Sequence, residues 1–237
     1  MIVRLFFNNR LEAGQIICLD EKQSHYLGNV LRLRAGDVFY VFDGQTGEYE
    51  AQITEFAKHG ATAVIGSKTK EMSLSPDIWL LFAPLKKDKT DMVIQKATEL
   101  GVRKIIPVRT AFTNAEKVRI ERFTAQAVEA AEQCRRLDVP VIEDVQLLPE
   151  LLKNWDVSRT LLFLDEKGRG RKIIDALSGQ NKAAVLIGPE GGFRSDEAQM
   201  LEELPFVKSV SLGQRILRAE TAAVAALACW QAVNGDW

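Results

Sequence analysis

Two patterns of hydrophobic and polar positions divide the chain near residue 70. Before that point, short runs rich in β-branched and aromatic residues are separated by turn signals such as Asn8-Asn9 and the DGQTG stretch at 43–47. The runs cover residues 2–7, 16–19, 38–42, 49–56 and 62–66. Regularly spaced short strands with such turns predict a small β-barrel, which a helical stretch at 24–33 interrupts.

From Asp77 onward, apolar runs alternate with amphipathic stretches. Strands are predicted at 78–83, 104–108, 141–142, 160–164, 184–187 and 207–212, and helices at 90–100, 118–135, 149–153, from Ile173, from Ser195 and at 219–233. Strand-helix-strand units of this length predict an α/β fold, a mainly parallel sheet with helices on both faces. The polar stretch 67–76, SKTKEMSLSP, is the expected linker, so the predicted domains are 1–70 and 71–237.

The stretch at 183–193, AAVLIGPEGGF, is the most informative part of the chain. Its apolar run does not alternate, which predicts a strand buried on both faces. Gly188, Gly191 and Gly192 then let a ligand approach the main chain closely, and Ser195 is the expected cap of the next helix. A glycine loop at the carboxyl end of a buried strand is a common ligand site, although a tight turn without a ligand is the simpler alternative.

A second glycine loop follows one helix later. Residues 213–218, GQRILR, come after the strand at 207–212 and lead into a last helix rich in small residues. Two loops on successive strands can close over one small molecule. Neither loop has the glycine spacing of a dinucleotide fingerprint or the lysine of a P-loop, so the ligand need not be a phosphate.

The helix predicted at 118–135 carries two stripes. Ile120, Phe123, Ala127, Ala130 and Cys134 form an apolar stripe, and Arg119, Arg122, Gln126, Glu129, Gln133 and Arg136 form a polar one. Arginines and glutamines in this mixture suit phosphate and base contacts, and a solvated helix face is the alternative. The basic loop 84–89 and Arg32 have the same two interpretations, contact with nucleic acid or a solvated surface. The charged loop 165–170 is expected to be a flexible connection.

Composition narrows the class of protein. The chain is 46% hydrophobic with a net charge of −1 and lacks a polybasic tail, so charge alone does not demand a nucleic-acid partner. Cys18, Cys134 and Cys229 are too far apart for a metal pattern or a disulfide framework, and no metal is expected. No window approaches a membrane span and the N-terminal apolar run is short for a signal peptide, which predicts a cytoplasmic protein.

Taken together, the motifs resemble those of the SPOUT, or α/β-knot, RNA methyltransferases, and specifically the bacterial 16S ribosomal RNA uridine-N3 methyltransferase family. The likeness rests on 25–27 with 30–33 and 36–37, on 98–102 with 105–107, on 129–133 with Arg136, on 186–193, and on 212–222. The last two are the specific motifs. The chain departs from the family in the centre. After Arg109, where the family often has an Arg-Ser pair, it has Phe112-Thr113-Asn114, and in place of the Arg-Trp pair it has Arg122-Phe123.

The resemblance implies a fold, a cofactor and partners. The fold would be a C-terminal α/β knot with a trefoil-knotted chain, preceded by a PUA-like β-barrel that binds RNA. The methyl donor would be S-adenosylmethionine, the substrate 16S rRNA in the small ribosomal subunit, and the assembly a homodimer. The residues expected at the cofactor are Leu186, Ile187, Gly188, Glu190, Gly191, Gly192, Leu212, Gly213, Ile216, Leu217 and Arg218.

Methylation of uracil N3 requires an imide proton to leave, and negative charge then develops on the flanking carbonyl oxygens. Arg218 or Arg136 is the expected stabilising cation, and Glu190 and Glu220 are candidate proton acceptors, although each glutamate could also brace its loop or helix end. Expected RNA contacts are Arg32, Lys86, Lys89, Arg109, Arg122, Gln133 and Arg136. N3 lies on the pairing edge, so the target base should be unpaired or extruded.

Three other functions compete with this hypothesis. A SPOUT methyltransferase acting on transfer RNA or another rRNA position would differ only in its product. A non-catalytic RNA-binding protein of ribosome assembly would be expected to have lost one glycine loop, and both are present. A Rossmann-type methyltransferase fits less well because its glycine loop follows the first strand of the domain.

Overall fold

The computed structural model describes residues 3–58, 60–113, 118–165, 170–179 and 181–237. The chain forms two compact units. Unit 1 comprises Met1–Leu74 and Ala131–Asp138, and unit 2 comprises Ser75–Ala130 and Val139–Trp237. Within the described part of the chain, no helix combines the length and the apolar character that a membrane span requires.

Unit 1 is built on a five-stranded sheet with the order β1-β3-β4-β5-β2. Its strands are β1 (Arg4–Phe6), β2 (Ile16–Leu19), β3 (Val38–Phe42), β4 (Gly47–Ala57) and β5 (Gly60–Glu71). β1 pairs with β3 in parallel and the other pairs are antiparallel. Alternate side chains of these strands form one apolar core, as the period of two predicts. Among the described residues no pairing joins β1 to β2, so the predicted barrel is not closed by hydrogen bonds.

The helical stretch of unit 1 is α1 (Glu21–His25), which continues as a π-helix over Tyr26–Val30. The N-terminus of α1 is capped by Asp20, whose side chain accepts the Gln23 N–H at 2.7 Å. Just after the π-helix, Arg32 adopts a positive φ of 60°.

The predicted linker is partly wrong, because β5 continues through Glu71. Glu71 and Lys70 pair with Gly47 and Glu48 at the start of β4. The side chains of residues 67–71 are exposed, and ladder hydrogen bonds use the backbone alone, so a polar sequence does not end a strand. Only 72–77 lie between regular elements.

Arg4 ties the end of α3 (Ile120–Cys134) into unit 1. Its buried guanidinium donates to the carbonyl oxygens of Ala131, Glu132 and Arg136 at 3.0 to 3.2 Å, and to Glu48 at 2.6 Å. A cation at a helix C-terminus satisfies carbonyls that have no partner within the helix. This contact explains why residues 131–138 belong to unit 1.

Unit 2 contains a wholly parallel eight-stranded sheet with the order β11-β13-β10-β12-β6-β7-β8, in which β9 also pairs with β7. The strands are β6 (Ile78–Phe82), β7 (Lys104–Arg109), β8 (Val141–Ile142), β9 (Gln146–Leu147), β10 (Thr160–Leu164), β11 (Arg171–Lys172), β12 (Ala183–Ile187) and β13 (Val207–Ser211). The helices besides α3 are α2 (Lys87–Glu99), α4 (Leu148–Lys153), α5 (Ile173–Leu177), α6 (Ser195–Glu203) and α7 (Ala219–Asn234). The predicted α/β class is confirmed.

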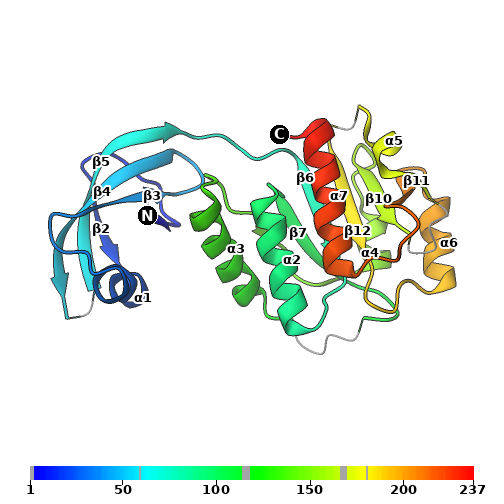
Figure 1. The fold of residues 1–237 in the computed structure, drawn as a ribbon, viewed down its shortest axis with the longest axis horizontal. Helices are drawn as coiled ribbons and strands as arrows, with labels where there is room; N and C mark the ends of the chain where they lie inside the picture. The colour runs from blue at the N-terminus through cyan, green and yellow to red at the C-terminus, as the bar shows by residue number, and fades with distance from the viewer. Residues whose placement is uncertain (1–2, 59, 114–117, 166–169, 180) are drawn as a thin grey trace. The chain divides into compact units, whose positions relative to one another are not determined.

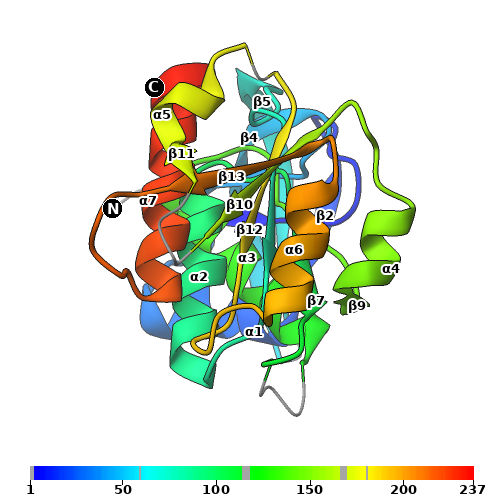
Figure 2. The same cartoon turned by 90° about the vertical axis from the view of Figure 1, so that its right-hand side faces the viewer.

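Helices cover both faces of this sheet. In Figure 1, α2 and α7 lie side by side along one face, where they enclose a core that includes Val93, Phe123 and Trp230. Figure 2 shows α4 and α6 on the opposite face, over a second core that includes Leu148 and Leu201. β12 is buried along its whole length, as its unbroken apolar run predicts.

The strand order places β10 between β12 and β13, the two strands that the glycine loops follow. Leu162 pairs with Val185 on one side and with Lys208 on the other. The carboxyl ends of all three parallel strands therefore meet at one edge of the sheet. The trefoil knot implied by the family resemblance stays a prediction.

Candidate functional site

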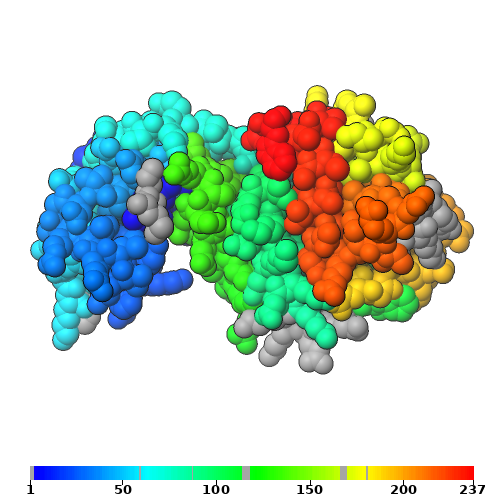
Figure 3. Space-filling view, in the orientation of Figure 1, coloured from blue at the N-terminus to red at the C-terminus, as the bar shows by residue number. Residues whose placement is uncertain are grey.

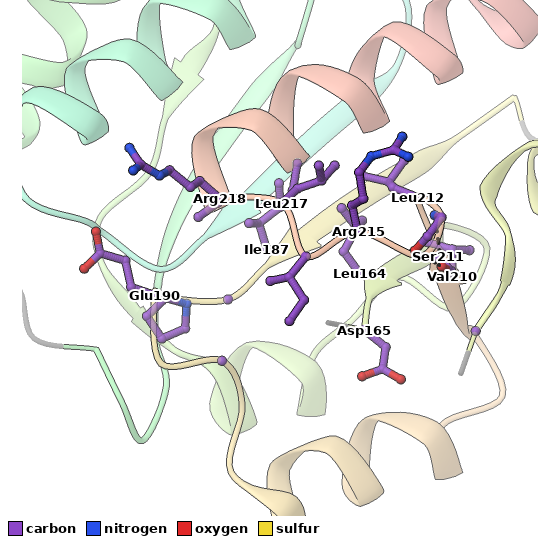
Figure 4. A pocket seen from close by; sticks show the side chains of 18 of the residues that line it. Leu164, Asp165, Ile187, Glu190, Val210, Ser211, Leu212, Arg215, Leu217 and Arg218 are labelled. Carbon is purple, nitrogen blue, oxygen red and sulfur yellow. Dashed lines mark hydrogen bonds between the residues drawn. The ribbon is translucent and has the colours of Figure 1, made fainter. Parts of the chain in front are cut away.

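A pocket of about 1250 Å³ opens at this edge of the sheet. Both glycine loops line it, from Ile187 to Gly192 and from Ser211 to Ala219, and the end of β10 contributes Leu164 and Asp165. Figure 3 shows residues 211–218, in deep orange, at the surface beside α7, and Figure 4 shows the side chains around the pocket. Both glycine loops therefore line one pocket. That this pocket binds the expected ligand stays a prediction.

The first loop turns tightly and needs its glycines. Gly192 has a positive φ of 70°, and its N–H donates to the Pro189 carbonyl at 2.9 Å. A Cβ on Gly188 would lie 2.5 Å from the ring of Phe193, which itself packs edge-on against Phe163 in the core. Gly188 therefore leaves room for the ring that anchors the loop.

The second loop has open space at its glycine. Gly213 has a φ of 108°, and no atom lies within 4 Å of the position that a Cβ would take. Its N–H donates to the Ser211 hydroxyl at 3.2 Å. The backbone of this loop is thus exposed to a ligand without an intervening side chain.

The predicted Ser195 cap is wrong. Arg194 is the residue before the first turn of α6, and Ser195 is the first helical residue. Glu197 satisfies the helix start instead, because its carboxylate accepts the Arg194 N–H at 3.0 Å. The Glu197 carboxylate thus binds the backbone N–H of the residue before the helix. It replaces the bond that the Ser195 hydroxyl was expected to accept from the first turn.

Charged side chains gather at one side of the pocket. Glu190 is paired with Lys89, which comes from the first turns of α2. The hydrogen bond from Lys89, its charge, and the charges of Lys86 and Arg218 lower the pKa of Glu190. Glu190 is therefore a carboxylate at neutral pH and a weaker base than an isolated glutamate.

Arg218 lies on the same side of the pocket as Glu190 (Figure 4). It is exposed, and no hydrogen bond or ion pair joins it to the described residues. It occupies the cap position of α7, a helix of 16 residues, so the positive end of the helix dipole adds to its charge. This corner of the pocket attracts negative charge.

Ten of the eleven residues expected at a cofactor line the pocket, and Leu186 does not. Side chains alternate along β12, so Ile187 faces the pocket and Leu186 packs into the core on the other face of the sheet. Glu220 is also absent from the pocket lining. It is buried at the start of α7, where its Oε2 atom has no hydrogen-bond partner among the described residues.

The expected RNA contacts divide into exposed and paired side chains. Arg32, Lys86, Arg109 and Gln133 are exposed. The other three already have carboxylate partners, namely Glu190 for Lys89, Asp91 for Arg122 and Asp138 for Arg136. The Arg136 side chain is only 8% exposed and binds both oxygens of Asp138, so the position of Arg136 does not suit contact with RNA or with a reacting base.

Sequence reasoning missed the part of the pocket contributed by β10 and its loop. Leu164, buried Asp165 and Gly170 line the pocket, whereas 165–170 was expected to be a flexible connection; residues 166–169 lie outside the described residues. The apolar run before Asp165 was recognised as a strand, but its place between β12 and β13 is not a local property of the sequence. Among the described residues, no group of three His, Cys, Asp or Glu side chains could hold a metal ion.

Two family models match the chain. An RNA methyltransferase domain matches residues 72–231, and an RNA methyltransferase PUA domain matches residues 19–66. The first covers more than half of the chain and contains every residue of the pocket. Fold and site thus define a protein of the RNA methyltransferase class with a PUA-like N-terminal unit.

Relatives narrow the class. The chain is 35% identical over 229 residues to the ribosomal RNA small subunit methyltransferase E of Rickettsia conorii, covering 95% of this chain and 93% of the relative. It is 29% identical to the protein of that name from Bacillus subtilis, covering 92% and 90%. The chain belongs to the ribosomal RNA small subunit methyltransferase E family.

A solved structure agrees along the whole chain. The ribosomal RNA small subunit methyltransferase E from Neisseria gonorrhoeae, crystallised with S-adenosyl methionine bound, superposes with a TM-score of 0.91 at 32% identity. The match covers 100% of both chains.

Proposed function

We propose that this protein transfers a methyl group from S-adenosylmethionine to N3 of a uridine in the 16S ribosomal RNA of the small subunit. The observation that carries the proposal is the pocket formed jointly by the two glycine loops at the carboxyl ends of β12 and β13. The named relatives supply the substrate class, and the family resemblance supplies the position on the base.

The pocket residues fit S-adenosylmethionine. When bound, the cofactor supplies a methyl group on a cationic sulfonium. Ile187, Leu212 and Leu217 offer apolar walls, and the open space at Gly213 leaves room for the adenine to approach the main chain of the loop. The buried carboxylate of Asp165 suits a hydroxyl or amino group of the ligand.

Arg218 is the residue that we place beside the reacting uracil. Loss of the N3 proton leaves negative charge on the carbonyl oxygens that flank N3. The Arg218 guanidinium is exposed at the pocket and aligned with the positive end of α7, so it can stabilise that charge without breaking an existing ion pair.

Glu190 serves to hold Lys89 at the pocket rather than to accept the proton. Its lowered pKa makes it a weak base, and Lys89 already occupies its Oε1 atom. Glu220 is buried in the first turn of α7 and does not line the pocket, so it is not the proton acceptor either.

RNA phosphates bind at the exposed cations on the same sheet edge. Lys86 follows β6 and Arg109 ends β7, and both strands run parallel to β12, so both residues lie at the carboxyl edge that carries the pocket. Arg32 and Gln133 are the exposed candidates in unit 1.

The active form is a homodimer, and the 85% exposure of Ile216 beside the pocket supports burial of this side chain by a partner or by the cofactor.

The test is methyl incorporation from labelled S-adenosylmethionine into small ribosomal subunits purified from cells that lack this gene, followed by mass spectrometry of the nucleosides. We expect N3-methyluridine as the product. Calorimetry on the same preparation of the protein measures its binding of S-adenosylmethionine and separates the possible negative outcomes. Binding without incorporation into the subunit would indicate another RNA target, and absence of binding would favour a non-catalytic assembly protein.

A further inference from the structure

An exposed aromatic side chain stands beside the first glycine loop. Phe112 is 45% exposed and belongs to the turn after β7, in which the Thr110 N–H donates to the Thr113 hydroxyl at 2.9 Å. A Cβ built on Gly191 would lie 3.4 Å from the Cβ of Phe112. Because Gly191 lines the pocket, the Phe112 ring lies at the edge of the pocket without forming part of its wall.

A buried carboxylate fixes this turn to the glycine loop. Glu197 is 9% exposed and lies in the first turn of α6, 86 residues away in the chain. Its Oε1 atom accepts the Ala111 N–H at 2.8 Å, and its Oε2 atom accepts the Arg194 N–H at 3.0 Å. One side chain thus connects the residue next to Phe112 with the segment that ends the glycine loop.

A nucleobase is the group that best suits an exposed aromatic ring at the edge of this pocket. Proteins that bind unpaired nucleic acid use exposed aromatic faces on which bases stack, and the reaction proposed here requires an unpaired or extruded base. An apolar ring does not bind a phosphate, and the cations Lys86 and Arg109 would bind the phosphates of the RNA. The backbone next to the ring is held by the bond from the Ala111 N–H to Glu197, so little backbone freedom is lost on stacking.

We propose that Phe112 is the surface on which an unpaired base of the RNA substrate stacks, and that Glu197 is a positioning residue that holds Phe112 beside the glycine loop. This inference rests on the proposed function and adds a substrate contact to it. It assigns a role to Phe112, which lies in the stretch where this chain departs from the Arg-Ser pair of the family resemblance.

The experiment is steady-state methylation of small ribosomal subunits by Phe112→Ala and Phe112→Trp, together with the Kd for S-adenosylmethionine. We expect Phe112→Ala to raise KM for the subunit about tenfold, because one base loses its stacking partner. Phe112→Trp should keep KM near the wild-type value, and neither change should alter cofactor binding. Trp237→Ala, which removes another exposed aromatic side chain of unit 2, is the matched control and should leave KM unchanged.

Glu197→Gln tests the positioning role, since the amide can accept only one of the two N–H groups. We expect KM to rise in this variant, and we expect the double variant Glu197→Gln with Phe112→Ala to have the KM of Phe112→Ala alone. Full additivity of the two effects would show that Glu197 does not act through Phe112, and unfolding midpoints identify any variant whose fold is lost.

The outcomes separate the two proposals. A wild-type protein that does not methylate the subunit would overturn the proposed function. An active wild-type protein whose Phe112→Ala variant has an unchanged KM would overturn only the stacking role. A Phe112→Trp variant as poor as Phe112→Ala would show that the ring packs against Gly191 and does not stack on a base.

Discussion

At the scale of single residues, Arg218 can be tested as the cation that stabilises the reacting base. Arg218→Ala should lower kcat for methyl transfer by about 100-fold, the typical cost of removing one group that stabilises developing negative charge. Stability should change little, because Arg218 is exposed and has no ion pair among the described residues. Rates from single-turnover methylation and midpoints from thermal unfolding check both statements.

Lys182→Ala is the control for this variant. Lys182 is an exposed cation that precedes β12, at the opposite end of the strand from the pocket. Its removal should leave both the rate and the stability at wild-type values. Equal rates in Arg218→Ala and Lys182→Ala would exclude Arg218 from the chemistry.

Glu48 is a buried carboxylate of unit 1 that is paired with Arg4. Burial alone would raise the pKa of Glu48, but hydrogen bonds from Arg4, Lys70 and Thr69 outweigh it and lower the pKa from its usual 4.5. A carboxyl group with a lowered pKa in the folded state stabilises the protein above pH 4.5, and this contribution is lost as pH falls through the folded pKa.

Glu48→Gln should therefore reduce the free energy of unfolding by about 3 kcal/mol at pH 7, because it leaves Arg4 buried without a countercharge. The difference from wild type should shrink below pH 4.5. Urea titrations at several pH values measure it. Glu12→Gln is the matched control, since its pair with Arg10 is exposed and 3.8 Å long, and a pH-independent difference in Glu48→Gln would contradict this argument.

At the scale of elements, the glycine loops can be tested separately from the fold. Gly213 and Gly179 both have positive φ angles, and no atom lies within 4 Å of a Cβ at either position. Alanine at each site should therefore cost a similar free energy of unfolding, about 1 kcal/mol. Only Gly213 lines the pocket, so only Gly213→Ala should weaken S-adenosylmethionine binding. Calorimetric Kd values decide the matter, and equal affinities in the two variants would remove the second loop from the site.

At the scale of the whole molecule, cofactor binding should appear as added stability. A ligand that binds only the folded state at 100 times its Kd raises the free energy of unfolding by about 2.7 kcal/mol. We expect S-adenosylmethionine to raise the thermal midpoint accordingly, and methionine at the same concentration to have no effect. The shift should be smaller in Gly213→Ala at equal ligand concentration; an identical shift would place the cofactor elsewhere.

Much of the secondary structure of this protein could be predicted from local pattern. The strands at 16–19, 38–42, 141–142 and 160–164 have their predicted bounds, and the unbroken apolar run of β12 correctly indicated burial on both faces. These features depend on side chains that lie within a few residues of one another, so the local sequence is enough to predict them. The first half of the predicted linker, residues 67–71, was wrong because pairing with β4, and not polarity, decides where β5 ends.

The sequence by itself determined the two glycine loops, the alternation of strands and helices, and the family to which the motifs point. Only the tertiary structure decided which residues meet at the pocket. The order β13-β10-β12 brings Asp165 to the site, the pleat of β12 turns Leu186 away from it, and the fold buries Arg136 in a pair with Asp138. The order of strands and the partners of charged side chains depend on residues distant in the chain, so no local pattern encodes them.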